Sequence, residues 1–171
     1  MAFSTSSMLG VDLTGVGGST QLFALGTPVR GSDDSYWSYV EATATFVTGE
    51  IVLINQAGTA KTCISANLTM TAGAAEVYYD VAFCQNVINQ GEFGWVAKRG
   101  RNLYVLVTGT LTAGSEHGLA VGANSGRLVA GTNGGNTLFG VVLTESVSAS
   151  GERSVAKCVL TWPRFQTTIY T

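Results

Sequence analysis

A chain of 171 residues can hold one domain with a full hydrophobic core, and its 46% hydrophobic residues include no run of about 20 that could span a bilayer. Charged residues make up only 12%, against roughly 25% in typical soluble domains. The net charge of −2, with nine basic residues spread along the chain, argues against a nucleic-acid partner. Since surface charge normally keeps a monomer dispersed, we expect other subunits to cover much of the exterior.

Residues 1–35 are punctuated by glycines, and only residues 22–25 look like a strand. A segment of this composition cannot bury enough apolar area to order itself alone. We expect either a flexible leader or an extended N-terminal arm that orders against a neighbouring subunit, and the arm is favoured. The rest of the chain, residues 36–171, is then the β-rich domain, with 36–80 and 81–171 as its candidate sub-domains.

Residues 36–47 are rich in aromatic and β-branched side chains, with apolar residues at alternate positions, which predicts a strand with one buried face. A short apolar run at 51–54 predicts a core strand. A glycine turn then leads into a second strand at 60–64, so these two form a hairpin. Residues 65–76 suit a short helix or an irregular connection.

The second half of the chain contains a series of strand-like stretches separated by glycines, at residues 77–87, 92–97, 103–111, 119–121, 127–129, 138–143 and 154–162. Both prolines, Pro28 and Pro163, fall at segment edges, where a missing N–H donor is tolerated. Lys98, Arg99 and Arg101 are interpreted as one exposed hairpin. Short strands at roughly 8–12-residue spacing, without a convincing amphipathic helix, predict an all-β barrel or sandwich.

The chain has three cysteines, Cys63, Cys84 and Cys158, and one histidine, His117. An odd cysteine count without CxxC spacing favours a reducing cytoplasm, and residues 1–8 lack the features of a secretion signal. A buried, inert thiol is the ordinary state in apolar strands, although His117 could activate Cys63 or Cys84 if the fold brought them together. The single histidine also leaves no paired ligand spacing for zinc.

A glycine-rich stretch at 15–20 lacks the lysine of a P-loop, and residues 122–126 misplace their serine for a nucleophile elbow. Tyr36, Trp37 and Tyr39 could stack on sugars or bases, but aromatic side chains on a strand are more often core contacts. No acid–base pair rises above background among the candidate carboxylates, which are Asp33, Asp34, Glu76, Asp80, Glu92 and Glu116. We therefore expect no catalytic, cofactor-binding or metal-binding residue, and no enzyme.

Short Gly- and Val-rich segments follow one another at residues 91–96 (GEFGWV), 105–107 (VLV), 119–121 (LAV), 127–130 (RLVA), 138–143 (LFGVVL) and 155–160 (VAKCVL). This series, within residues 85–162, resembles the capsid decoration (cement) proteins of tailed bacteriophages. The resemblance implies a small β-barrel or β-tulip-like domain on the outside of an icosahedral head. Such a domain binds at junctions between capsomers and resists internal DNA pressure, with no catalytic residues. Residues 1–80 lie outside the resemblance.

We therefore expect a virion protein of the capsid surface, made in the host cytoplasm, that binds the major capsid protein and neither nucleic acid nor a membrane. Repetition on a symmetric shell favours a homo-oligomer, with a trimer preferred to a dimer. Strand edges and extended arms could add to a neighbour's sheet. The alternatives are another virion component such as a tail tube, fibre or head-fibre subunit, then a depolymerase or cysteine hydrolase, then a carbohydrate-binding module.

Overall fold

A computed structural model describes residues 11–31, 33–63, 78–114, 119–121, 126–130, 137–148 and 154–166. All regular elements within these ranges are strands, which confirms the predicted all-β class. They are β1 (Pro28–Arg30), β2 (Tyr36–Ala42), β3 (Ile51–Asn55), β4 (Thr59–Thr62), β5 (Tyr78–Cys84), β6 (Phe93–Val107), β7 (Thr110–Leu111), β8 (Leu119–Val121), β9 (Leu128–Ala130), β10 (Thr137–Leu143), β11 (Val147–Ser148) and β12 (Ser154–Gln166). No helix long and apolar enough to cross a membrane occurs among the residues described.

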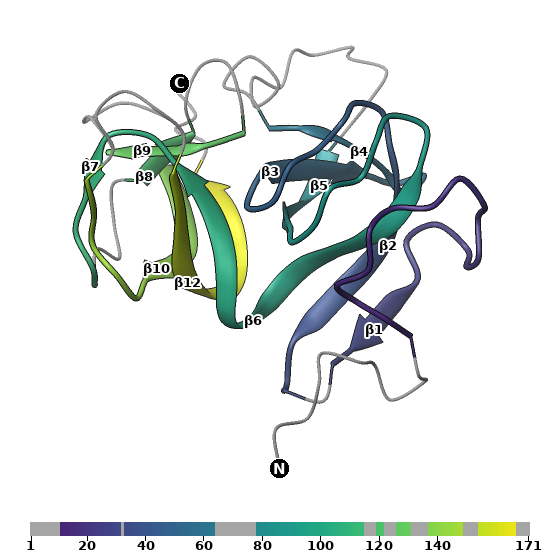
Figure 1. Ribbon diagram of the computed structural model, residues 1–171, viewed down its shortest axis with the longest axis horizontal. Helices are drawn as coiled ribbons and strands as arrows, with labels where there is room; N and C mark the ends of the chain where they lie inside the picture. Colours follow the sequence, from purple (N-terminus) through teal and green to yellow (C-terminus); the bar gives the residue numbers. More distant parts are fainter. Residues whose placement is uncertain are drawn as a thin grey trace.

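The main sheet closes on itself twice. The order β2–β4–β3–β5–β6 returns to β2 through the antiparallel β2–β6 pairing, and we call this closed set the first ring. The order β6–β12–β10–β8–β9 returns to β6 through the parallel pair Val107–Leu128, and we call it the second ring. Figure 1 shows the two rings side by side, with β6 running from one into the other. The predicted small β-barrel is thus confirmed.

Strand β6 serves both rings because it bends between residues 98 and 102. It pairs with β2 as far as Arg99, and from Arg99 onward it pairs with β12. Asn102 lies in this bend with φ 55°. Strand β12 has a bulge at the position opposite Gly140 of β10, and the φ of Gly140 is 80°. A Cβ at Gly140 would lie 2.8 Å from the carbonyl oxygen of Thr161, so the close approach of β10 and β12 requires glycine there.

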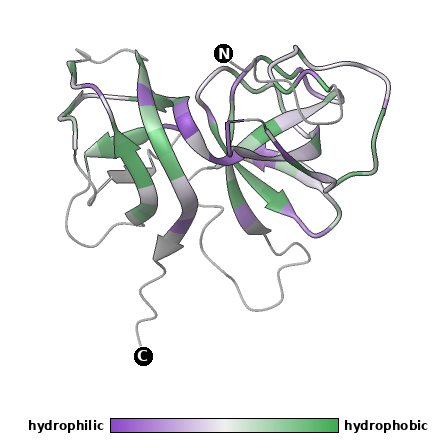
Figure 2. Ribbon diagram, turned by 90° about the horizontal axis from the view of Figure 1, so that it is seen from below, coloured by the Kyte–Doolittle hydropathy of each residue, from purple (hydrophilic) through white to green (hydrophobic). Residues whose placement is uncertain are grey.

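Alternate residues of the first ring point into two different cores, so both faces of its strands are buried. The smaller core is made mainly of small side chains, as the narrow interior of a five-stranded barrel requires: Val40, Ala42, Phe46, Val52, Ile54, Ala60, Ala82, Cys84, Ile88 and Val96. The opposite faces of the same strands join residues of the second ring in one larger core, which includes Trp37, Ile51, Phe83, Trp95, Leu128, Leu138 and Leu160. Figure 2 shows hydrophobic residues along the strands of both rings.

Two sets of hydrogen bonds hold the first ring against residues 103–107 of β6, the part of the strand that belongs to the second ring. The backbone N–H of Leu106 donates to the carbonyl oxygen of Gly49 at 2.7 Å. The buried Gln85 carboxamide accepts from the Tyr104 N–H at 2.8 Å and donates to the Tyr104 carbonyl oxygen at 3.0 Å. Gly49 has φ 82°, and a Cβ there would lie 2.6 Å from the Leu106 nitrogen. These contacts fix the angle between the rings.

Residues 11–31 lie against the first ring of their own chain. Leu13 is buried, and Phe23 packs edge-on against Tyr39 with ring centroids 5.3 Å apart. The Gly26 N–H donates to the Tyr39 carbonyl oxygen, and the Tyr39 N–H donates to that of Thr27. The sequence favoured an arm ordered by a neighbouring subunit, whereas these residues are ordered by their own ring. The division into residues 1–35 and 36–171 stays a prediction.

Several local predictions were wrong. Residues 22–25 form no strand, and the N-terminal strand is β1 instead. Strand β2 ends at Ala42 and is buried on both faces rather than one. The basic triplet at 98–101 lies in the continuous strand β6, so the predicted hairpin does not exist. Pro163 lies inside β12, where the bulge tolerates its missing N–H. Residues 65–76 lie outside the described residues.

Candidate interaction surface

The three cysteines are free and buried. Burial raises the pKa of the Cys158 thiol to about 12. Burial, with a smaller contribution from the Glu50 charge, raises the pKa of Cys84 to about 12, and burial also raises the pKa of Cys63. A thiol attacks only as the thiolate, so these side chains are suited to packing rather than to nucleophilic chemistry.

Two of the carboxylates that were weighed as acid–base candidates, Asp33 and Glu92, accept hydrogen bonds from residues close to them in the sequence. Asp33 accepts hydrogen bonds from the N–H and hydroxyl of Ser35, and Glu92 accepts from the backbone and side-chain amides of Asn89. No three His, Cys, Asp or Glu side chains in the described ranges gather closely enough to hold a metal ion. The candidates that lie outside those ranges are Glu76, Glu116, His117 and residues 122–125.

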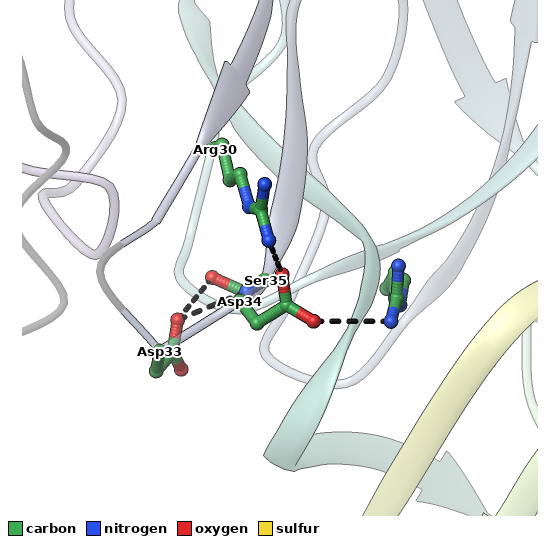
Figure 3. A network of polar contacts seen from close by, with 5 residues as sticks. Arg30, Asp33, Asp34 and Ser35 are labelled. Carbon is green, nitrogen blue, oxygen red and sulfur yellow. Dashed lines mark hydrogen bonds and ion pairs between the residues drawn. The ribbon is translucent and has the colours of Figure 1, made fainter.

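Charged and aromatic side chains from both rings meet in one surface cluster. Asp34 Oδ1 accepts a hydrogen bond from Arg30, and its Oδ2 accepts one from Arg99 Nη2 at 3.0 Å. Figure 3 shows Arg30 and Asp34 facing each other beside the Asp33–Ser35 turn. Both guanidinium groups lie over the Tyr36 ring, at 5.7 and 5.9 Å from its centroid. The hydrogen bond from Arg30 lowers the pKa of Asp34, and the charges of Arg30, Arg99 and Arg101 lower it further.

The cluster continues from Tyr36 across the junction of the rings. The Tyr36 and Trp162 ring centroids lie 5.1 Å apart, and Lys98 Nζ lies 5.8 Å from the Trp162 centroid. Lys98 also donates to Asp80 Oδ2 at 2.6 Å. We call Arg30, Asp34, Tyr36, Asp80, Lys98, Arg99 and Trp162 the seam cluster. Its members come from β1, β2, β5, β6, β12 and the β1–β2 turn, so only the folded chain assembles it.

The backbone around the seam cluster is strained. Among the described residues, the non-glycine positions with positive φ are Asp34 (65°), Asn102 (55°) and Trp162 (58°), and each lies in the cluster or in the adjoining bend of β6. Asp and Asn tolerate this conformation, whereas it costs an ordinary residue about 1–2 kcal/mol and is an outlier for a bulky one such as Trp162. Trp162 is nevertheless 47% exposed. The positive φ of Trp162 falls in the bulge of β12 opposite Gly140, and this bulge directs the indole ring to the surface.

A second feature is a cavity of about 410 Å³ between the N-terminal segment and the first ring. Its rim includes Val16 and Leu22, which are 76% and 73% exposed. The lining is mostly apolar, and the Asp12 carboxylate within it accepts hydrogen bonds from the N–H and hydroxyl of Thr14. The lining residues are Val11, Asp12, Gly15, Val16, Gly18, Thr20, Leu22, Phe23, Tyr39, Phe93, Gly94 and Trp95. The predicted glycine-rich stretch at 15–20 therefore forms a cavity wall.

The sequence identified parts of this surface only. Trp37 and Tyr39 are buried, which confirms their interpretation as core residues. Tyr36 is partly exposed and belongs to the seam cluster instead. Trp162 and Arg30 were missed as interaction residues because nothing near them in the sequence marks their meeting with β6.

The fold defines an all-β protein of two closed rings that share one bent strand. No family model matches the chain, and no curated protein matches it. Among solved structures, it is similar to the head fiber gp8.5 N base in bacteriophage phi29, with 11% identity and a TM-score of 0.46 over 77% of this chain and 98% of that one. A likeness of this degree leaves the function to be argued from the chain's own residues.

Proposed function

We propose that this chain is a structural protein of a tailed-bacteriophage virion that decorates the outer surface of the capsid. The observation that carries the proposal is the seam cluster, a set of aromatic and basic side chains in a chain with only 12% charged residues. Arg30 and Trp162 are exposed, and the other aromatic and basic members are half-buried: Tyr36, Lys98 and Arg99. Trp, Tyr and Arg are the residues that most often dominate binding at protein interfaces. A charge-poor exterior of this kind is suited to a subunit that other proteins cover.

The strands support attachment by side chains rather than by strand addition. Among the described strands, both rings are closed, and three strands pair on one side alone: β1, and β7 with β11, which form a separate pair over two residues each. Strand β1 has three residues and begins with Pro28, which cannot donate to a ladder. A short edge strand with a proline is a poor template for a partner strand.

The capsid is proposed as the partner because of the resemblance of residues 85–162 to decoration proteins. These residues include all of β6 and the rest of the second ring as far as Trp162 in β12, and the larger core ties them to the first ring. The two rings share one strand and are fastened at Gly49 and Gln85, so the subunit is a stiff block. A stiff block that loses little entropy on docking suits a protein that reinforces a shell at many equivalent positions.

Binding to heads of the phage that encodes the chain tests the proposal. Purified protein is mixed with mature heads and, separately, with unexpanded precursor heads, and bound protein is quantified after sedimentation. We expect saturable binding to mature heads and weak binding to precursors. Absence of binding to mature heads would refute the proposal.

The same sample separates the alternative virion roles. A tail tube, fibre or head-fibre subunit predicts elongated trimers in solution, whereas a decoration protein predicts compact particles. Sedimentation velocity distinguishes the two from the frictional ratio.

A further inference from the structure

We propose that the seam cluster is the face that docks on the capsid, and that its counterpart is an acidic protein surface whose carboxylates flank a slot for Trp162. This inference rests on the proposed function and adds to it the attachment face and the chemistry of the partner. It assigns the strained tryptophan to the centre of the contact and the surrounding cations to its rim.

The charge of the cluster favours an acidic partner. The chain as a whole carries −2, with nine basic and eleven acidic residues. Four of the nine, Arg30, Lys98, Arg99 and Arg101, gather at the seam, where the neighbouring carboxylates are Asp33, Asp34 and Asp80. The local charge is therefore opposite in sign to that of the chain. Complementary charge across an interface guides orientation and raises the association rate.

The arginines keep donors for a partner. A guanidinium group has five N–H donors in a fixed fork, and the hydrogen bonds to Asp34 use one Nη2 group each from Arg30 and Arg99. Asp34 and the Tyr36 ring hold both forks in place, so little side-chain freedom is lost when a carboxylate binds their remaining edges.

A protein fits this surface better than a nucleic acid does. Nucleic-acid binding depends on contacts with a row of phosphates, which four cations gathered in one place cannot follow, whereas the donor edges of the arginines need only a small number of partner carboxylates. Trp162 also packs against Tyr36 and lies close to Lys98, which leaves part of its ring to enter a pocket rather than to stack on a series of bases.

The test measures binding of full-length variants to mature heads in about 0.15 M salt. Trp162→Ala is expected to weaken binding about 30-fold or more, as loss of a central hot-spot side chain does. Trp162→Phe is expected to retain part of the affinity, and Arg99→Gln to weaken it about 10-fold. The matched controls, Tyr104→Ala on β6 and Lys157→Gln on β12, are exposed outside the cluster and should bind as the unmodified chain does.

A second measurement reads the chemistry of the partner directly. Binding to mature heads is measured as salt is raised from about 0.15 M to about 1 M, where the screening length falls to about 3 Å. We expect binding to weaken with salt, and the weakening to be smaller for Arg99→Gln, which lacks one of the cations that would face a partner carboxylate. The thermal midpoint of each variant shows that it is folded, and Arg99→Gln, whose side chain is 40% exposed, tests the surface even if Trp162→Ala does not fold.

The outcomes are distinct. If the unmodified chain binds mature heads and all cluster variants bind equally well, the inference fails while the proposed function stands. If the unmodified chain does not bind heads, both fail. If Trp162→Ala instead dissociates an oligomer of this chain, or abolishes binding to DNA, the occupant of the surface is a second copy or a nucleic acid, and the inference is refuted.

Discussion

The carboxamide of Gln85 provides the sharpest test of how the two rings are joined. It lies just after β5, is 8% exposed, and forms two hydrogen bonds to the backbone of Tyr104, in the part of β6 that pairs with β12. Gln85→Leu keeps much of the side-chain volume and removes both bonds. Each net bond contributes about 1 kcal/mol, and leaving buried backbone groups unpaired adds a further penalty, so we expect a loss of about 2–4 kcal/mol. For a chain of this size, that lowers the thermal midpoint by roughly 4–16 °C.

The variant Gln85→Glu distinguishes the contributions of the two hydrogen bonds, because protonation of the introduced carboxyl changes with pH. At neutral pH the introduced carboxylate still accepts from the Tyr104 N–H, but it cannot donate to the Tyr104 carbonyl oxygen and faces that oxygen with a negative charge. Burial and this repulsion raise the pKa of the introduced carboxyl in the folded state. A raised pKa means that the cost is absent below the unfolded value of about 4.3 and grows as pH rises through the folded value.

Urea unfolding between pH 4 and pH 7, followed by circular dichroism, measures both variants. We expect the Gln85→Glu deficit relative to the unmodified chain to shrink as pH falls, and the Gln85→Leu deficit to stay constant. A Gln85→Leu variant within about 0.5 kcal/mol of the unmodified chain would show that this contact does not fasten the rings.

Three further predictions concern the barrel interior, the seam and the thiols. Phe46→Ala, which empties a fully buried position of the smaller core, should cost about 3–5 kcal/mol by chemical denaturation, and Phe46→Leu clearly less; equal losses would contradict the packing described. Trp162→Gly should be about 1 kcal/mol more stable than Trp162→Ala, because glycine adopts positive φ without strain; the reverse order would refute the strain. The three thiols should resist alkylation at pH 8 in the native state and react after unfolding, because burial raises their pKa; fast native labelling of any one would contradict its burial.

The strands were predictable where apolar and β-branched residues cluster, as at 51–54 and 138–143. A small barrel was expected, but its arrangement as two rings that share β6 was not, because burial of both faces of β2 removes the contrast between apolar and polar positions that marks a one-sided strand. The basic triplet at 98–101 was interpreted as an exposed hairpin, yet the backbone continues through these residues while the strand bends. The seam cluster could not be predicted from the sequence either, because its members come from distant segments of the chain. Arg30 and Trp162 are brought together only by β2, β6 and β12, and no local pattern carries that information.

Cryo-electron microscopy of the phage particle that carries this chain would show where on the virion the chain is bound. We expect density for the two-ring fold on the outer surface of the head, repeated with the capsid symmetry, with the Trp162 face against the major capsid protein. Particles that lack the chain on the head, or that carry it only in the tail, would contradict this expectation.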